Sequence, residues 1–343
     1  NTIRDLQQVG IIPDILICRS DIPIPKEIKE KLAMHTNLPL QNIISAINSH
    51  SIYQVPLNFI SEGIHLLLID KFKMKHKLNT LQWKKLNQRI LELKPSKSIK
   101  LGIVGKYTEL SDSYKSLLEA LFHASIYHNY KIKVEWINSK LDKSVRLNTI
   151  DGVIVPGGFG NSGIETMIST IQDAREKKIP TFGICLGMQL MAIEFYRNVL
   201  QLKTACSEET EETEEDDRQS EKTDTCIVKK LNQTSEMGGT MRLGKHTIQI
   251  SSKRVRKIYG SDIIHERHRH RYTLDDRYSK GLNRNDFHVV GRCPDTNLIE
   301  IIEYSEKKHP WYIGTQYHPE YQSSPFNAHP LFLSFIQHCI RHN

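Results

Sequence analysis

The sequence has 343 residues, of which 38% are hydrophobic and 25% are charged. Domains cluster near ~100–150 residues, so this length predicts two units, and the composition excludes collagen-like and wholly disordered classes. The 47 basic residues exceed the 39 acidic ones by eight, and their scatter along the chain favours no nucleic-acid partner. No run reaches the ~20 apolar residues that a membrane span requires. We therefore expect a cytoplasmic protein without a membrane partner.

The first predicted elements form an α/β unit. A strand is expected at 15–17, a helix at 26–35, a second strand at 43–47 and a second helix at 81–93. The segment 94–98 (Lys-Pro-Ser-Lys-Ser) then breaks the pattern with a proline and polar residues, which is typical of a linker. The predicted domains are therefore 1–94 and 95–343.

After this linker, apolar strands alternate with helices. Strands are expected at 99–104, 152–155 and 179–184, and helices at 113–127, 164–177 and 186–200. Such alternation is typical of an α/β fold with a doubly wound, mostly parallel sheet. Ligands of these sheets bind at the carboxyl ends of the strands.

One segment departs from this regularity. Eight of the ten residues from Glu208 to Asp217 are acidic, and polar residues continue to about Ser235. Like charges repel and extend the chain, so we expect a mobile acidic loop over 207–235.

The six cysteines are widely spaced and contain no Cys-x-x-Cys pair, which favours reduced thiols over a disulfide framework. One of them, Cys185, lies in the segment 183–189 (Gly-Ile-Cys-Leu-Gly-Met-Gln), where a buried strand leads directly into a helix. A tight turn with flanking glycines places a nucleophile at the helix N-terminus, where backbone N–H groups favour a thiolate. The alternative is a structural cysteine in a core strand.

Two further segments complete a candidate catalytic set. In the segment 314–320, His318 and Glu320 are two residues apart, and in extended backbone they project to one face. His318 could then take the thiol proton while Glu320 orients the imidazole. The segment 156–160 (Pro-Gly-Gly-Phe-Gly) follows a buried strand and suits the presentation of a backbone N–H to an oxyanion. Each segment alone is also compatible with an ordinary surface pair or turn.

Together and in this order, these segments resemble the triad-type glutamine amidotransferases. Other segments resemble the CTP synthase family in particular, and the resemblance covers essentially the whole chain. They are 18–21, 51–56, 105–107, 112–116, 239–244 and 266–272.

The resemblance implies roles for individual residues. Cys185 matches the nucleophile, and His318 and Glu320 complete the triad. The oxyanion-binding backbone is matched by Gly158 and Leu186. The implied glutamine-binding positions are Gly158, Leu186, Gly187, Met188, Gln189, Glu209 and Arg271, and the implied nucleotide-binding positions are Arg19 and Lys31. A carboxylate suits the substrate ammonium group, and a guanidinium suits its α-carboxylate.

The chain departs from the family pattern in several places. Glu209 follows Cys206-Ser207-Glu208 where the family has Asn-Ser-Thr, so its assignment depends on spacing within an acidic run. Ser162 stands where an Arg is usual, and Asn48 stands where an Asp is expected. No Gly-x-x-x-x-Gly-Lys-Ser/Thr phosphate loop is present, so we expect a C-terminal fragment that begins within the amidoligase domain and contains the whole glutaminase domain.

The resemblance implies ATP-dependent amination of UTP to CTP, with ammonia taken from glutamine. ATP and Mg²⁺ are expected for the full-length enzyme and no cofactor is expected in this chain. GTP activation, CTP inhibition and a homotetramer are implied as well. A metal site at His265, His268 and His270 is not expected, because the intervening arginines would repel a cation. The rival interpretations are another triad amidotransferase such as a GMP synthase, and a non-catalytic scaffold or filament subunit.

Overall fold

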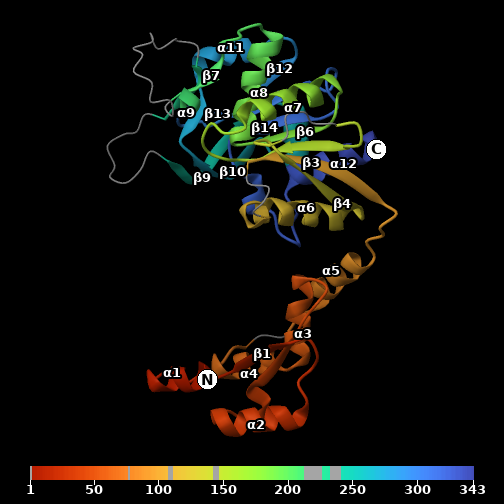
Figure 1. Cartoon of the computed structure of the whole chain (residues 1–343), viewed down its shortest axis with the longest axis vertical. Coiled ribbons are helices and arrows are strands. Elements are labelled where there is room, and N and C mark those ends of the chain that lie inside the picture. The colour runs from red at the N-terminus through yellow and green to blue at the C-terminus, as the bar shows by residue number, and fades with distance from the viewer. Residues whose placement is uncertain (1, 76–77, 107–110, 142–146, 212–225, 232–240) are drawn as a thin grey trace. The chain divides into compact units, whose positions relative to one another are not determined.

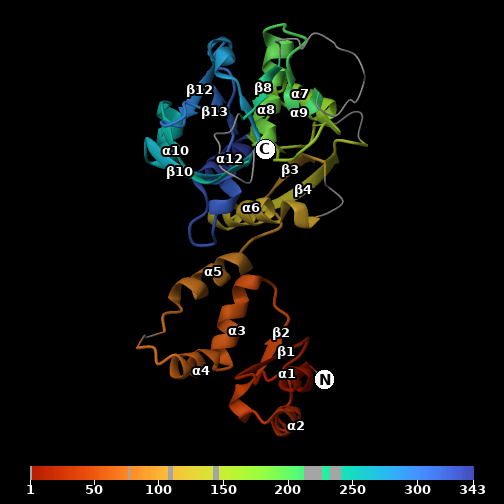
Figure 2. The ribbon, with the colours of Figure 1, turned by 90° about the vertical axis from the view of Figure 1, so that its left-hand side faces the viewer.

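The chain forms two compact units, Asn1–Glu92 (unit 1) and Leu93–Asn343 (unit 2), so the division lies close to the predicted linker. The computed structural model describes residues 2–75, 78–106, 111–141, 147–211, 226–231 and 241–343. Each unit is an α/β structure, and each is described separately below (Figures 1 and 2).

Unit 1 is built around a pair of parallel strands, β1 and β2, in which Leu16 lies opposite Ile43. Ile43 and Ile44 are buried because the helices pack against this strand pair. The predicted elements at 26–35, 43–47 and 81–93 are confirmed to within two residues. The elements of unit 1 are α1 (Thr2–Gln8), β1 (Leu16–Ser20), α2 (Lys26–Thr36), η1 (Leu40–Asn42), β2 (Ile43–Ile47), η2 (Ile52–Gln54), α3 (Val55–Ser61), α4 (Ile64–Lys71) and α5 (Leu81–Leu91).

Unit 2 contains a nine-stranded sheet in the order β10-β9-β12-β13-β14-β6-β5-β3-β4. The pairings from β14 to β4 are parallel, and those from β10 to β14 are antiparallel. Its strands are β3 (Ser98–Gly105), β4 (Lys131–Asn138), β5 (Gly152–Val155), β6 (Thr181–Ile184), β9 (Arg242–Ile250), β10 (Ile263–His270), β12 (Phe287–Arg292), β13 (Ile299–Tyr304) and β14 (Tyr312–Thr315).

Helices cover both faces of this sheet, which confirms the predicted doubly wound fold. Helices α7 and α8 pack together on one side, whereas α6 and α12 pack together on the other (Figure 1). The helical elements of unit 2 are η3 (Ser111–Tyr114), α6 (Lys115–His128), α7 (Ile164–Glu176), α8 (Leu186–Glu194), η4 (Phe195–Val199), α9 (Glu208–Glu211), α10 (Lys253–Tyr259), η5 (Asp276–Tyr278), α11 (Ser279–Leu282), η6 (Pro319–Gln322) and α12 (Pro330–His342).

A small three-stranded sheet, ordered β11-β8-β7, includes one strand, β8, from the region predicted to be a mobile loop. Its strands are β7 (Cys206–Ser207), β8 (Cys226–Lys230) and β11 (Tyr272–Leu274). The prediction of a loop is wrong for 226–230, because these residues form a strand that pairs with β11 and β7, and Ile227 and Val228 are buried. Glu208–Glu211 form α9. The remaining parts of the predicted loop, 212–225 and 232–235, lie outside the described residues.

The expectation of reduced thiols is wrong for one pair. Cys206 and Cys226 form a disulfide. The two residues lie opposite each other on the paired strands β7 and β8, and this pairing brings together two thiols that are far apart in the sequence. Cys18, Cys185, Cys293 and Cys339 are free.

Candidate active site

The candidate nucleophile lies in a strained turn between β6 and α8. Cys185 has φ 54° and ψ −103°, a sparsely populated conformation of the kind that occurs at nucleophile elbows. Close packing on both sides holds the turn in place. A Cβ at Gly187 would collide with the carbonyl oxygen of Val155, and one at Gly183 would collide with Met191 and the backbone of Gly187. The two flanking glycines are therefore required by packing, and they allow α8 to begin directly behind the sulfur.

His318 and Glu320 meet as predicted, although by a different backbone path. The Nδ1 atom of His318 lies 2.7 Å from Oε1 of Glu320. Residues Pro319–Gln322 form a 3-10 turn and not an extended strand, so the turn brings Glu320 back onto the imidazole. The His318 amide donates to the carbonyl of Arg267 at 2.8 Å, which fixes the start of the turn against β10.

The imidazole of His318 is placed between the Glu320 carboxylate and the Cys185 sulfur. Burial lowers its pKa, but the charges of Glu320 and Cys185 and hydrogen bonds to both raise that pKa well above its ordinary value. A Cβ added to Gly157 would lie 2.8 Å from Cε1 of His318 and 3.5 Å from Cβ of Cys185, so all three residues converge. Tyr321 stacks on the imidazole with ring centroids 5.0 Å apart. The site thus favours an imidazolium beside the sulfur.

A cleft of about 510 Å³ opens over this triad. Its lining includes the three triad residues and the guanidinium-bearing Arg269, which had not been predicted as a site residue. The other lining residues are Asp112, Ser113, Tyr114, Lys115, Ser116, Leu117, Pro156, Gly157, Gly158, Phe159 and Tyr321. The cleft therefore combines the candidate nucleophile, the candidate base and the predicted oxyanion turn in one space.

The predicted oxyanion turn, 156–160, follows β5 and lies beside the elbow. A Cβ at Gly158 would be 3.4 Å from Leu186 Cδ2, so the two predicted oxyanion residues are neighbours. Two side chains hold the far end of the turn. Lys106 Nζ donates to the carbonyls of Phe159 and Gly160, and Glu209 Oε1 accepts from the Gly160 amide at 2.8 Å.

Lys106 is a residue of this site to which the sequence analysis gave no role. Only 4% of it is exposed. Burial lowers its pKa to about 8, and the nearby Glu209 opposes that shift. The segment 105–107 contributed to the family resemblance, so the motif was visible in the sequence, but its position beneath the turn depends on the fold.

The predicted glutamine-binding residues Glu209 and Arg271 come together in a cavity of about 240 Å³. Phe159, Met241 and Tyr272 complete its lining. Phe159 also lines the cleft over Cys185, so this ring borders both spaces. A carboxylate and a guanidinium therefore border a small space next to the catalytic cleft.

The other predicted glutamine-binding residues on α8 are buried. Gly187 contacts the backbone of Val155, and Met188 packs against Gly314. The Gln189 side chain donates from Nε2 to the carbonyl of Tyr272 at 3.0 Å and to Oε1 of Gln316 at 3.1 Å. These side chains thus support the elbow from behind, and none of the three lines the cleft.

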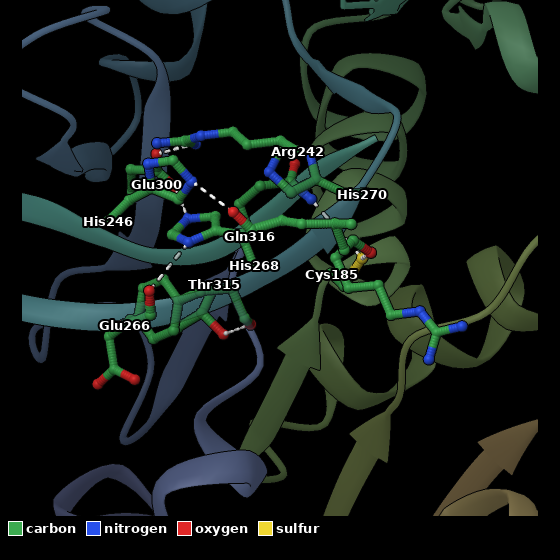
Figure 3. A network of polar contacts seen from close by, with 12 residues as sticks. Cys185, Arg242, His246, Glu266, His268, His270, Glu300, Thr315 and Gln316 are labelled. Atoms are coloured by element: carbon green, nitrogen blue, oxygen red, sulfur yellow. Dashed lines mark hydrogen bonds and ion pairs between the residues drawn. The ribbon is translucent and has the colours of Figure 1, made fainter. Parts of the chain in front are cut away.

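Strand β10 divides its charged residues between two faces. Glu266, His268 and His270 are buried, whereas Arg267 and Arg269 are exposed. His268 Nε2 lies 2.8 Å from Glu300 Oε2, and Arg242 pairs with the other oxygen of Glu300 (Figure 3). Among the residues that the structure describes, no group of three or more His, Cys, Asp or Glu is arranged to hold a metal ion.

The predicted nucleotide-binding residues belong to unit 1. Arg19, on β1, is exposed and its Nε donates to Asn48 Oδ1 at 3.4 Å. Lys31, on α2, is exposed. In the described part of the chain, no single helix has the length and apolar character to cross a membrane, and only the bent pair Ile52–Ser61 and Ile64–Lys71 passes this test, by length and composition alone.

Two family models match the chain. One, described as glutamine amidotransferase class-I, matches residues 109–338. The other, described as CTP synthase N-terminus, matches residues 1–74. The second match lies in unit 1, outside the residues that match the amidotransferase model.

Curated relatives match nearly the whole chain. A CTP synthase of Hydrogenobaculum sp. (strain Y04AAS1) is 42% identical over 98% of this chain and 62% of its own length. A CTP synthase of Aquifex aeolicus (strain VF5) is 41% identical over 100% of this chain and 63% of its own length. The chain thus spans less than two thirds of the length of these relatives.

A solved structure matches most of the chain. The structure described as the Trypanosoma brucei CTPS glutaminase domain with bound acivicin has a TM-score of 0.63 and 30% sequence identity. The match covers 71% of this chain and 94% of that domain.

Proposed function

The chain belongs to the class-I glutamine amidotransferases and, within them, to the CTP synthase family, and we propose on this basis that it hydrolyses glutamine to supply ammonia for amination of UTP. The observation that carries the proposal is the convergence of Cys185 with the His318–Glu320 pair in one cleft. An intact triad of this geometry counts against a non-catalytic scaffold. The match to the CTP synthase N-terminus counts against a GMP synthase.

The geometry supports a stepwise hydrolysis. The Nδ1–H of His318 donates to Glu320, which leaves Nε2 to take the thiol proton of Cys185. The sulfur attacks the carboxamide carbon, and the amides of Gly158 and Leu186 stabilise the oxyanion. His318 then protonates the leaving ammonia, and a second cycle with water releases glutamate from the thioester.

Glutamine recognition is assigned to the cavity beside the cleft. Glu209 would hold the substrate ammonium group and Arg271 its α-carboxylate, because a guanidinium binds a carboxylate in bidentate fashion. The backbone of 186–189 and Gly158 would face the carboxamide end, while Met188 and Gln189 act through their packing behind the elbow. Phe159 borders both spaces and would lie along the aliphatic part of the substrate.

The synthetase half of the reaction is proposed from family membership. ATP would activate the uracil 4-oxygen of UTP, and the ammonia would displace the phosphate. Arg19 and Lys31 are cations that would attract nucleotide phosphates. The described residues offer no cluster of carboxylates for Mg²⁺, so no step of this chain is assigned to the metal. GTP activation, CTP inhibition, a homotetramer and a cytoplasmic location belong to the same proposal.

The test is ammonia release from glutamine by the purified full chain. Cys185→Ser should abolish release, because a hydroxyl at this position ionises far less readily than a thiol. His318→Ala should lose roughly 10²–10⁴ in turnover. Cys293→Ser is a matched control, since Cys293 is a free, buried thiol outside the cleft, and it should retain activity. Turnover by Cys185→Ser within tenfold of wild type would contradict the proposal.

A further inference from the structure

We propose that Gln316 is a further functional residue of the glutaminase site, whose side-chain amide donates an N–H to the sulfur of Cys185 and fixes that sulfur for attack. The inference deepens the proposed function and rests on it. Gln316 directly follows β14, two residues before His318, and its side chain lies beside Cys185 (Figure 3).

The contact between the amide and the sulfur is direct. Gln316 Nε2 lies 3.8 Å from Cys185 Sγ, and Gln316 is 0% exposed. The thiol has a separate partner, the carbonyl oxygen of Arg269 at 4.0 Å, which can only accept a hydrogen bond. A thiolate has no proton to give to that carbonyl and needs donors instead. In the buried site, the Gln316 amide is such a donor.

The orientation of the Gln316 amide follows from its neighbours. The carbonyl of Tyr272 can only accept, so the group of Gln189 that faces it is the NH₂. The same NH₂ of Gln189 also faces the side-chain amide of Gln316, at 3.1 Å. The atom of Gln316 that accepts this hydrogen bond is therefore Oε1. The NH₂ of Gln316 is then left to point at the sulfur.

The Tyr272 carbonyl, at which this chain of hydrogen bonds begins, is itself held in place. His270 Nδ1 lies 2.8 Å from the Tyr272 carbonyl, and burial lowers the pKa of His270 to about 3. The ring is therefore neutral, and its one N–H serves that carbonyl. The backbone amide of Gln316 donates to the Glu300 carbonyl at 2.9 Å. Both ends of the amide chain are thus fixed by main-chain atoms.

A purely structural role for Gln316 makes different predictions, so the test measures the sulfur itself. Iodoacetamide alkylates thiolates, and mass spectrometry can follow the Cys185 and Cys18 peptides separately in the full chain. Gln316→Met keeps the length and removes the donor, so it should slow alkylation of Cys185 roughly tenfold or more, as expected for a lost hydrogen bond to a charged group. Alkylation of Cys18, in unit 1, should not change.

Steady-state kinetics supply a second readout. Gln316→Met should lower kcat for glutamine hydrolysis roughly tenfold and leave KM within about twofold, because the amide contacts the nucleophile and not the substrate. Gln316→Glu has the same shape but places a carboxylate beside the sulfur, so its kcat for glutamine hydrolysis should be lower than that of Gln316→Met. The control Thr273→Val removes a buried hydroxyl that has no partner among the described residues, and it should behave as wild type.

Each outcome decides the question. Alkylation of Cys185 within twofold of wild type in both Gln316 variants would overturn the proposal, as would a rise in KM without a fall in kcat. If Gln316→Met is less folded than Thr273→Val by circular dichroism, the shape-conserving Gln316→Glu decides. Alkylation needs no glutamine, so it still tests this inference if the wild-type chain proves unable to hydrolyse glutamine and the proposed function fails.

Discussion

At the scale of single residues, two opposite charges define the space beside the nucleophile. Glu209 and Arg271 line one cavity, and their opposite charges match the ammonium and carboxylate groups of an amino acid. Glu209 also accepts a hydrogen bond from the Gly160 amide, so the same carboxylate connects this cavity to the predicted oxyanion turn. In the proposed function, recognition of glutamine and construction of the oxyanion hole would therefore share Glu209.

Arg271→Ala should raise KM for glutamine roughly 10–100-fold, because a bidentate charged pair is lost. Arg267→Ala is the matched control, since Arg267 lies on the exposed face of β10 and lines neither cavity. Initial rates of ammonia release over a range of glutamine concentrations measure both. Equal increases of KM in the two variants would mean that the arginines act only as a surface patch.

The candidate triad residues could be proposed from the sequence because each belongs to a short local motif. The contact between His318 and Glu320 was expected from extended backbone, yet a 3-10 turn produces it, and local spacing cannot distinguish these two paths. Lys106 and Gln316 were not assigned roles, because their contacts join residues that are far apart in the chain. The distances that define them, to Phe159 and to Cys185, exist only after the sheet has formed.

At the scale of elements, the parallel half of the sheet follows from the alternation of apolar strands and helices. Strand β4 was not predicted, although Ile132, Val134 and Trp136 alternate with the exposed Lys131 and Lys133, a period of two that marks an edge strand. The antiparallel extension from β13 to β10 was also not predicted. Strands β9, β10 and β13 contribute Arg242, His268 and Glu300, whose ion pairing inside the protein is not visible from hydrophobic periodicity.

The Cys206–Cys226 disulfide holds the short strands β7 and β8 together. The bridge joins residues separated by 20 positions, and closing a loop of this size stabilises a fold by about 3 kcal/mol in the chain-entropy account. The double variant Cys206→Ser/Cys226→Ser should therefore lower the free energy of unfolding in urea by up to about that amount. Cys293→Ser, measured alongside, controls for the loss of a buried thiol.

Reduction supplies an independent check of the same bridge. A reductant should destabilise the wild-type chain and leave the double variant unchanged. Two results together would contradict a stabilising bridge between β7 and β8. The wild type would have the same urea midpoint with and without reductant, and the double variant would have the same free energy of unfolding as the wild type.

At the scale of the whole molecule, stability should depend on pH through buried neutral histidines. Burial lowers the pKa of His270 and of His309 to about 3, below the ordinary 6.5. Between these values the unfolded chain binds more protons than the folded one, so the free energy of unfolding falls as pH drops from about 6.5 toward 3. Each histidine contributes a slope of at most about 1.4 kcal/mol per pH unit.

The effect of His318 on the pH dependence of stability has the opposite sign. Its pKa is raised in the folded protein, so its stabilising contribution is complete below 6.5 and fades at higher pH. The effect of His309 is isolated by comparing wild type with His309→Asn in urea unfolding at pH 7 and pH 5. Between pH 7 and pH 5, the decrease in the free energy of unfolding should be smaller for the variant than for wild type, by up to about 2 kcal/mol. Identical losses in both proteins would show that His309 titrates normally.

The central claim is that Cys185 forms a covalent intermediate with glutamine. Acid quenching of the full chain during turnover, followed by peptide mass spectrometry, tests it most directly. The account predicts a γ-glutamyl adduct on the peptide that contains Cys185, no adduct on the peptides of Cys293 or Cys339, and loss of the adduct in Cys185→Ser. Ammonia release without an adduct at Cys185, or an adduct on another cysteine, would contradict it.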